Sequence, residues 1–355
     1  MELIKDKQTH TDALSYFNLY RIKIRFSISL LLVTLILVSI AALTIGPMNI
    51  PISSFFNSIT NSGLNHYIIY DVRLPRILAT IFVGAAMASS GAIIQGLFQN
   101  PLAAPDILGI SAGSQLLATL TILFLSSSSS QWVQLWALPI SSILGSLAVM
   151  LFINYVVHKT SNTNMSFLIV LGVILNLVLM APIQLAPFIA NDNTLRSLMV
   201  WGMASFSNID WLHLIISFPL FILGFICLKN SALFLNALKL GSFEATNLGI
   251  NSKQKQKILF IGISLLVGTS TALCGPVSMI GFLVPHVIRM IYSNCYRFLL
   301  PLSALLGACL MTIVDTFCRA ALQPIELPVN IVLTLISTPI LIYAIIKIYK
   351  KDYLL

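Results

Sequence analysis

Residues 77–105 read ILATIFVGAAMASSGAIIQGLFQNPLAAP and contain no Asp, Glu, Lys or Arg. A helix rises about 1.5 Å per residue, so about 20 uncharged apolar residues are enough to cross the hydrocarbon core of a membrane. Similar uncharged runs cover residues 26–45, 107–158, 160–191, 211–228, 258–288 and 327–346. The pattern predicts an all-α, polytopic integral membrane protein that sits in a lipid bilayer.

The composition supports a membrane protein rather than a soluble one. Hydrophobic residues make up 57% of the chain and charged residues 9%, whereas soluble domains carry about 25% charged residues. The net charge of +9 does not indicate nucleic-acid binding, because the basic residues lie at the edges of apolar runs and not in one patch. The apolar run from Phe26 to Pro47 is too long for a signal-peptide core, so we expect a retained first span.

The runs divide into ten expected membrane spans. The polar stretch 126–131 splits one long run, and Gly275-Pro276 splits another because proline ends a helix. The expected spans are 26–45, 77–98, 107–125, 135–157, 165–189, 211–228, 258–273, 281–293, 298–317 and 329–346. We expect a cytoplasmic N-terminal segment over 1–25 and a single transmembrane domain over 26–355.

The distribution of Lys and Arg predicts the orientation. Ten spans place both termini on one side, and on that side fall 16 of the 20 Lys and Arg residues. The other side keeps Arg73, Arg76, Arg196 and Arg319. Because basic residues concentrate in cytoplasmic loops, both termini are predicted to be cytoplasmic.

The longest loop on the cytoplasmic side covers residues 229–257. Two short helical segments are expected within it, 232–240 and 243–248, separated by Gly241. Amphipathic helices of this length need a surface to pack against. They could lie in the lipid headgroup layer or dock a partner protein, and the residues alone leave both interpretations open.

Sequence motifs give no sign of an enzyme. No GxxxxGK[ST] occurs, and no glycine is followed by lysine, so the chain has no P-loop for nucleotide phosphates. Any ATP hydrolysis must come from another subunit. HExxH is absent from the sequence, and the five cysteines show no metal-binding spacing, so no cofactor or metal is expected on this chain.

Three segments together resemble the FecCD-type permeases of ABC importers for iron-siderophores, haem and cobalamin. The resemblance covers most of the chain, and the order and spacing of the segments are specific. The first contains Arg73-Leu74-Pro75-Arg76, Gly84, Gly91, Gln95, Asn100-Pro101-Leu102-Ala103 and Leu108-Gly109. The second runs from Gly275-Pro276 to Gly281, Pro285, His286 and Arg289, and the third has Asp315, Arg319 and Glu326-Leu327-Pro328.

The resemblance implies a type II ABC importer permease fold and a role for each segment. Asn100, Pro101 and Leu102 are expected to form the inner gate. Arg73, Arg76 and Arg319 are expected to receive acidic residues of an extracytoplasmic substrate-binding protein, because arginine binds carboxylates with a planar fork. Gly241, Ala245, Leu248 and Gly249 match the coupling region that contacts a cytoplasmic ABC ATPase subunit.

Each of these roles has a simpler structural alternative. The small residues near Gly84 and Gly91 can serve only close helix packing. Asn100-Pro101 can be a plain helix-terminating turn. Arg319 can pair with Asp315, which lies four residues earlier on the same expected helix. Gly281, Pro285, His286, Arg289 and Asp315 are interpreted as structural helix-end residues, and no metal ligand is expected among them.

The sequence is therefore interpreted as the membrane subunit of an ATP-driven importer in a bacterial cytoplasmic membrane. The expected partners are ATPase subunits, a substrate-binding protein and a second permease subunit. The spans carry few charges, which suits a bulky metal chelate better than a bare ion, since an ion needs ligating side chains. The alternative classes are a secondary transporter or channel that works without an ATPase, and a membrane scaffold that only binds proteins.

Overall fold

The computed structural model describes residues 2–48, 63–125, 131–160, 165–292, 294–323 and 325–352. Within these ranges every regular element is helical. The elements are α1 (Glu2–Thr44), α3 (Leu64–Tyr67), the π-helix η1 (Ile68–Arg73), α4 (Leu74–Leu97), α5 (Ile110–Leu125), α6 (Gln131–Thr160), α7 (Met165–Ile189), α8 (Asp192–Gly202), α9 (Trp211–Cys227), α10 (Ser231–Leu238), α11 (Ser242–Asn247), α12 (Ser252–Cys274), α13 (Ile280–Ile291), α14 (Tyr296–Ala321) and α15 (Val329–Asp352).

Each of the ten expected spans coincides with one helix. Six helical segments in the described ranges are long and apolar enough to cross a membrane: residues 22–44, 64–97, 135–157, 167–189, 252–274 and 296–321. Helix α9 passes the same test together with α10, across a bend of 45°. Helices α5 and α13 are shorter but apolar, and so is the part of α15 over Val329–Tyr343. The all-α polytopic fold is confirmed.

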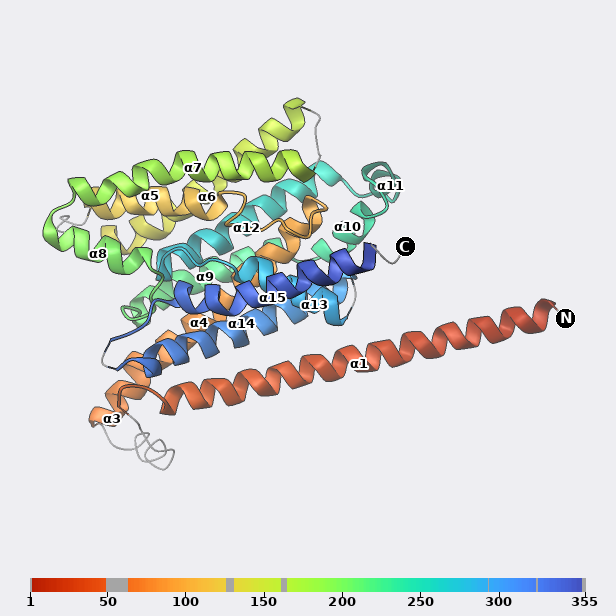
Figure 1. Cartoon of the computed structure of the whole chain (residues 1–355), viewed down its shortest axis with the longest axis horizontal. Helices are drawn as coiled ribbons and strands as arrows, with labels where there is room; N and C mark the ends of the chain where they lie inside the picture. The colour runs from red at the N-terminus through yellow and green to blue at the C-terminus, as the bar shows by residue number, and fades with distance from the viewer. Residues whose placement is uncertain are drawn as a thin grey trace.

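The spans form one bundle with α4 and α12 at its centre. Most residues of these two helices are buried, whereas residues 22–44 of α1 and residues 167–189 of α7 lie at the periphery, with few buried side chains. Helix α14 packs along α4, α12 contacts α6 and α9, and α1 lies against α14. Figure 1 shows α1 continuing far beyond the bundle at its N-terminal end.

Glycine pairs set the closest helix contacts around α4. A Cβ atom on Gly84 would lie 2.3 Å from the carbonyl oxygen of Gly307 in α14, and one on Gly91 would lie 1.8 Å from that of Gly281 in α13. Pro285 lacks an N–H, so it cannot donate the usual helical hydrogen bond to the Gly281 carbonyl, against which Gly91 packs. Small residues thus allow backbone contact between spans, as expected in a lipid environment.

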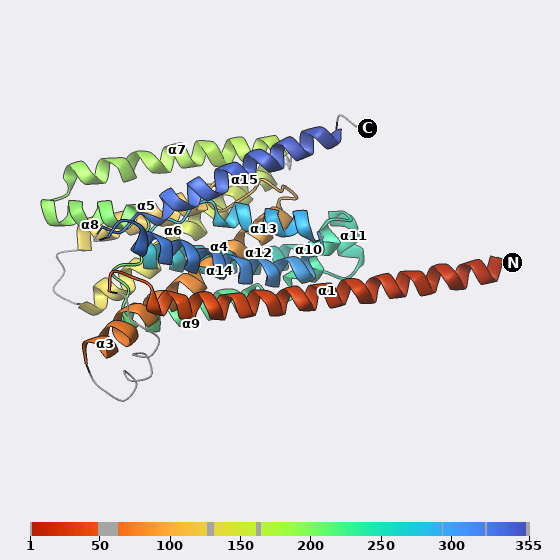
Figure 2. The same ribbon diagram turned by 60° about the horizontal axis from the view of Figure 1, so that its bottom comes forward.

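The two ends of the bundle differ in what they carry. Helices α10 and α11 lie at the end where both chain termini are found, while α3 and α8 lie at the opposite end (Figures 1 and 2). These are called the inner and the outer end below. The two helices expected in the inner loop are present as α10 and α11. Helix α8, at the outer end, was not predicted.

Candidate functional site

At the outer end, Arg76 is the centre of a buried ion cluster. Its Nη2 lies 2.8 Å from Asp315 Oδ1 in α14, and its Nη1 lies 2.8 Å from Glu326 Oε1, in the segment that precedes α15. A second contact of 2.9 Å joins Nη2 to Glu326 Oε2, so the guanidinium holds Glu326 with two parallel hydrogen bonds. The side chains of Arg76 and Asp315 are only 6% and 2% exposed, whereas Glu326 is 32% exposed.

The other two outer arginines are also bound within the chain. Arg319 Nε lies 3.3 Å from Asp315 Oδ2, and its Nη2 donates a hydrogen bond of 3.1 Å to the carbonyl of Ala42 in α1. Arg73, the last residue of η1, donates hydrogen bonds to the carbonyl of Leu43, in the last turn of α1, and to that of Met48, which follows α1. Arg73 and Arg319 therefore tie η1 and α14 to the outer end of α1.

This arrangement bears on the predicted docking role of Arg73, Arg76 and Arg319. All three side chains are buried, and the alternative pairing of Arg319 with Asp315 is present. Arg73 and Arg76 do not share a set of partners, because the first reaches α1 and the second reaches α14. Docking of an acidic partner stays a prediction, and it requires that the partner carboxylates replace acceptors inside the chain.

At the inner end, α4 ends in a turn over residues 98–109. The Asn100 side chain is buried and its Oδ1 accepts a hydrogen bond of 2.8 Å from the backbone N–H of Leu102. Pro101 and Leu102 are exposed, with Leu102 at 41%. Asn100 thus holds the turn, and Leu102 is the apolar side chain that the turn presents. The gate function of these residues stays a prediction.

The inner loop exposes an apolar surface on a defined backbone. Gly241 and Gly249 have φ values of +128° and +77°, which explains glycine at both positions. Ala245 is fully buried inside the loop, while Leu248 is 64% exposed. The large apolar side chains exposed on this loop, here called the coupling surface, are Leu233, Leu240, Phe243 and Leu248.

Helix α10 is fastened to the membrane spans on two sides. Asn236 Oδ1 accepts a hydrogen bond of 3.1 Å from the N–H of Tyr296, the first residue of α14. Gln99, directly before Asn100 in the turn over residues 98–109, donates a hydrogen bond of 2.6 Å to the carbonyl of Leu238. Lys239 Nζ lies 4.5 Å from the centre of the Tyr296 ring, and burial together with nearby Arg289 lowers the pKa of Lys239.

Helix α13 carries the remaining predicted residues and contacts α4. Arg289 donates hydrogen bonds to Gln95 Oε1 and, at 3.4 Å, to the hydroxyl of Tyr296. The ring of His286 stacks on Phe282 with centroids 5.8 Å apart, and its Nε2 has no hydrogen-bond partner among the described residues. Arg289 therefore links α13 to α4 and α14, and no cluster of three metal-ligating side chains forms in the described ranges.

Three residues that shape these sites were not singled out as site residues from the sequence. Glu326 was noted only as part of a motif, although it completes the cluster around Arg76. Gln99 and Asn236 connect the inner loop to the spans. The polar character of Gln99 beside the Asn100-Pro101 turn was an available signal. No spacing rule links Asn236 to Tyr296, because the two are 60 residues apart.

Comparison with known proteins places this geometry in a family. The chain is 33% identical to the hemin transport system permease protein HmuU of Yersinia pestis over 92% of this chain and 97% of that protein. It is 33% identical to the vitamin B12 import system permease protein BtuC of Vibrio vulnificus, over 91% and 94% of the two chains.

A solved structure and a family model agree with these relatives. The structure, described as a metal-chelate type ABC transporter in an inward-facing conformation, matches with a TM-score of 0.77 and 30% identity. The match covers 90% of this chain and 98% of the other. The model of the FecCD transport family matches residues 31–347. The helical bundle described above is therefore that of a multi-pass permease, and the chain belongs to the FecCD transport family.

Proposed function

We propose that this chain is the membrane subunit of an ATP-driven importer that takes up an iron chelate, haem or cobalamin. A second permease subunit completes the translocation path, a separate pair of ABC ATPases binds the inner end, and a substrate-binding protein binds the outer end. The chain lies in a bacterial cytoplasmic membrane with both termini inside. The relatives named above, which include hemin and vitamin B12 permeases, support this range of substrates.

The coupling surface is the observation that carries the proposal. Leu233, Leu240, Phe243 and Leu248 are exposed on a loop whose helix α10 is held by hydrogen bonds to Gln99, which follows α4, and to Tyr296 of α14. A flexible loop would absorb the movement of a partner, whereas an anchored one transmits it. Burying such side chains against an ATPase supplies the binding free energy, since each large apolar side chain contributes about 1.5–3 kcal/mol.

The path of transmission follows from the contacts of α10. The side chain of Gln99 joins α10 to the turn over residues 98–109, and Leu102 is exposed on that turn. We propose that closure of the ATPases on ATP displaces α10 and α11, and that Gln99 and the turn that follows it carry the displacement to Leu102. Substrate is then released by a change of shape at the gate, with no chemical step on this chain.

The test is binding of the ATPase to the affinity-tagged permease in detergent. Phe243→Asp and Leu248→Asp are expected to weaken binding at least tenfold, because each loses the burial of one large apolar side chain. Leu322→Asp, which changes a leucine that is 58% exposed at the outer end, is the matched control and should bind as the wild type does. Substrate uptake by the permease alone, in vesicles with no ATPase, would instead support the secondary transporter or channel.

A further inference from the structure

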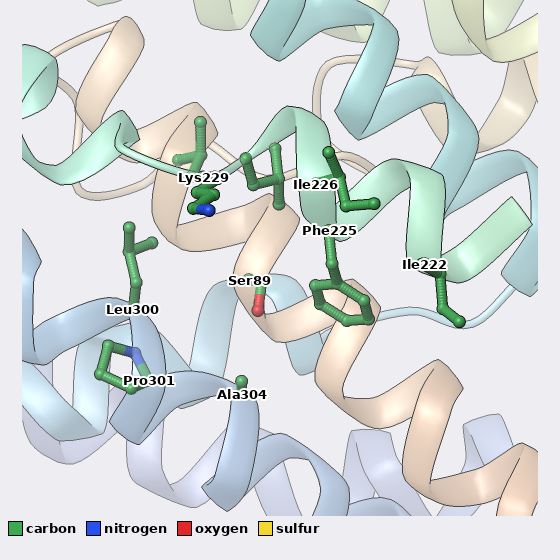
Figure 3. A pocket seen from close by; sticks show the side chains of 10 residues that line it. Ser89, Ile222, Phe225, Ile226, Lys229, Leu300, Pro301 and Ala304 are labelled. Atoms are coloured by element: carbon green, nitrogen blue, oxygen red, sulfur yellow. The ribbon is translucent and has the colours of Figure 1, made fainter. Parts of the chain in front are cut away.

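A groove opens between α4, α9 and α14 on the side of the bundle. Its volume is about 450 Å³, within the range of about 300–1,000 Å³ that is typical of small-molecule sites. Figure 3 shows the Ser89 hydroxyl and Ala304 on facing helices, with Phe225 on the third. The lining residues are Ser89, Ile93, Ile222, Phe225, Ile226, Leu228, Lys229, Leu300, Pro301 and Ala304.

The groove lies in the inner half of the bundle. Ser89 and Ile93 belong to the last three turns of α4, and Leu300, Pro301 and Ala304 belong to the first turns of α14. Lys229 follows the last residue of α9 at the inner end of the groove. With the orientation proposed above, these residues lie at the depth of the cytoplasmic leaflet.

The wall of the groove faces outward from the bundle. Ile222 is 40% exposed and Ile226 is 58% exposed, and Pro301 on the opposite wall is exposed as well. In a membrane, such a lateral surface is in contact with lipid chains. The interior of the groove is almost entirely apolar, with Ser89 and Lys229 as the polar side chains of its lining, so hydrocarbon fills it at little cost in polar burial.

The groove cannot close by a simple approach of its walls. Helix α9 is held on α12, where a Cβ atom on Gly224 would lie 2.7 Å from Leu266. Helix α14 is held on α4 by the backbone contact of Gly84 with Gly307. The small side chains of Ser89 and Ala304 therefore leave space between fixed helices. An unfilled gap of this size forfeits the dispersion contacts of its lining.

The inner end of the groove is cationic. Lys229 lines it, is exposed, and has no carboxylate within ion-pair distance in the described part of the chain. An ammonium group at the headgroup boundary, above an apolar groove, complements the two parts of an anionic phospholipid.

We propose that this groove binds one anionic glycerophospholipid of the cytoplasmic leaflet. An acyl chain lies between α9 and α14 over Ser89 and Ala304, and the phosphate pairs with Lys229. Lys229 also lies at the 45° bend between α9 and α10. The bound lipid therefore stabilises the bend that sets the position of α10, which links the lipid composition of the membrane to the inner loop.

The test uses the purified full-length chain in detergent, titrated separately with phosphatidylglycerol and phosphatidylcholine, with retained lipid counted by native mass spectrometry. The wild type is expected to retain one phosphatidylglycerol in preference to phosphatidylcholine. Lys229→Gln should weaken phosphatidylglycerol binding about fivefold, the effect of one basic residue at a membrane surface, and leave phosphatidylcholine unchanged. Ala304→Phe fills the groove and should abolish retention of both lipids.

Lys253→Gln is the matched control, because Lys253 is an exposed inner lysine outside the groove. If Lys253→Gln weakened phosphatidylglycerol binding as much as Lys229→Gln does, the lipid would be attracted to the inner lysines in general, and the proposal would be overturned. Equal retention of the two lipids by the wild type, or unchanged retention in Ala304→Phe, would also overturn it. Ala304→Leu replaces Ala304→Phe if the latter does not elute as a folded protein. The ATPase is not needed, so failure of the transport proposal would not alter this result.

Discussion

The guanidinium of Arg76 and the carboxylate of Asp315 lie 2.8 Å apart, although 239 residues separate them in the sequence. Arg76 is near the start of α4 and Asp315 is near the end of α14, so this pair fixes the outer ends of two spans that pack along their whole length. Glu326 forms a second ion pair with Arg76, and Arg319 forms a second ion pair with Asp315. The first role of this cluster is therefore structural: it holds the outer ends of α4 and α14 together.

Asp315→Asn should destabilise the protein by about 3–5 kcal/mol, because it leaves Arg76 and Arg319 buried with one fewer anionic partner. Glu326→Gln should cost about 1 kcal/mol or less, since that side chain is 32% exposed and water replaces part of the interaction. The measurement is the midpoint of thermal unfolding of the two variants in detergent at one ionic strength. If both variants shifted this midpoint equally, the burial of Asp315 would not determine its contribution to stability.

Glu326→Gln also probes the predicted docking of an acidic binding protein. If partner carboxylates must replace Glu326 at Arg76, removing its charge should raise the affinity several-fold and steepen the dependence on salt. The measurement is binding of the cognate substrate-binding protein to reconstituted permease at two salt concentrations. An affinity unchanged in Glu326→Gln would place docking elsewhere on the outer end. Reversal of all three arginines is a weaker experiment, because their burial couples it to unfolding.

A single cysteine at Leu102 should cross-link to its counterpart across the axis of a permease dimer, and more readily in one nucleotide state than in another. The exposed position of Leu102 makes the thiol accessible, whereas a cysteine at Asn100 would be buried and would remove the hydrogen bond that holds the turn. Leu322→Cys, exposed at the outer end, serves as the control for nonspecific cross-linking. The same yield in every nucleotide state would leave the turn with a structural role.

Gly91→Ala should destabilise the bundle by about 1–3 kcal/mol, the typical effect of overpacking, because the added Cβ atom meets the Gly281 carbonyl at 1.8 Å. Gly202→Ala adds the same methyl group where no atom lies within 4 Å and should leave stability nearly unchanged. The midpoint of unfolding in a mild denaturant series, measured for both variants, tests this difference. If the unfolding midpoint shifted equally in both variants, the close contact between α4 and α13 would not contribute to the effect of Gly91→Ala.

The spans were predictable because a membrane imposes one simple constraint, the absence of charge over about 20 residues. The helices of the inner loop followed from Gly241 and the apolar residues on either side. Helix α8 was missed because its residues are mixed in polarity. Its N-cap, Asn191, was a local signal: Asn191 Oδ1 accepts a hydrogen bond of 2.9 Å from the N–H of Thr194.

The partners of the outer arginines were harder to predict. Sequence spacing gives the face of a helix on which Arg76 lies, but it does not give the helix that packs there. Glu326 is 250 residues away, and only the assembled bundle brings it to Arg76. The pairing of Arg319 with Asp315 was predictable as an alternative because both lie on one helix, four residues apart.

The hydrogen bond from Gln99 to the carbonyl of Leu238 has a mechanical consequence for transport. It joins the end of α10 to Gln99, directly before Asn100-Pro101-Leu102, so if this turn is the gate, a displacement of α10 reaches it through a direct contact. In the proposed importer, displacement of α10 by the ATPases and opening of the gate are therefore expected to occur together.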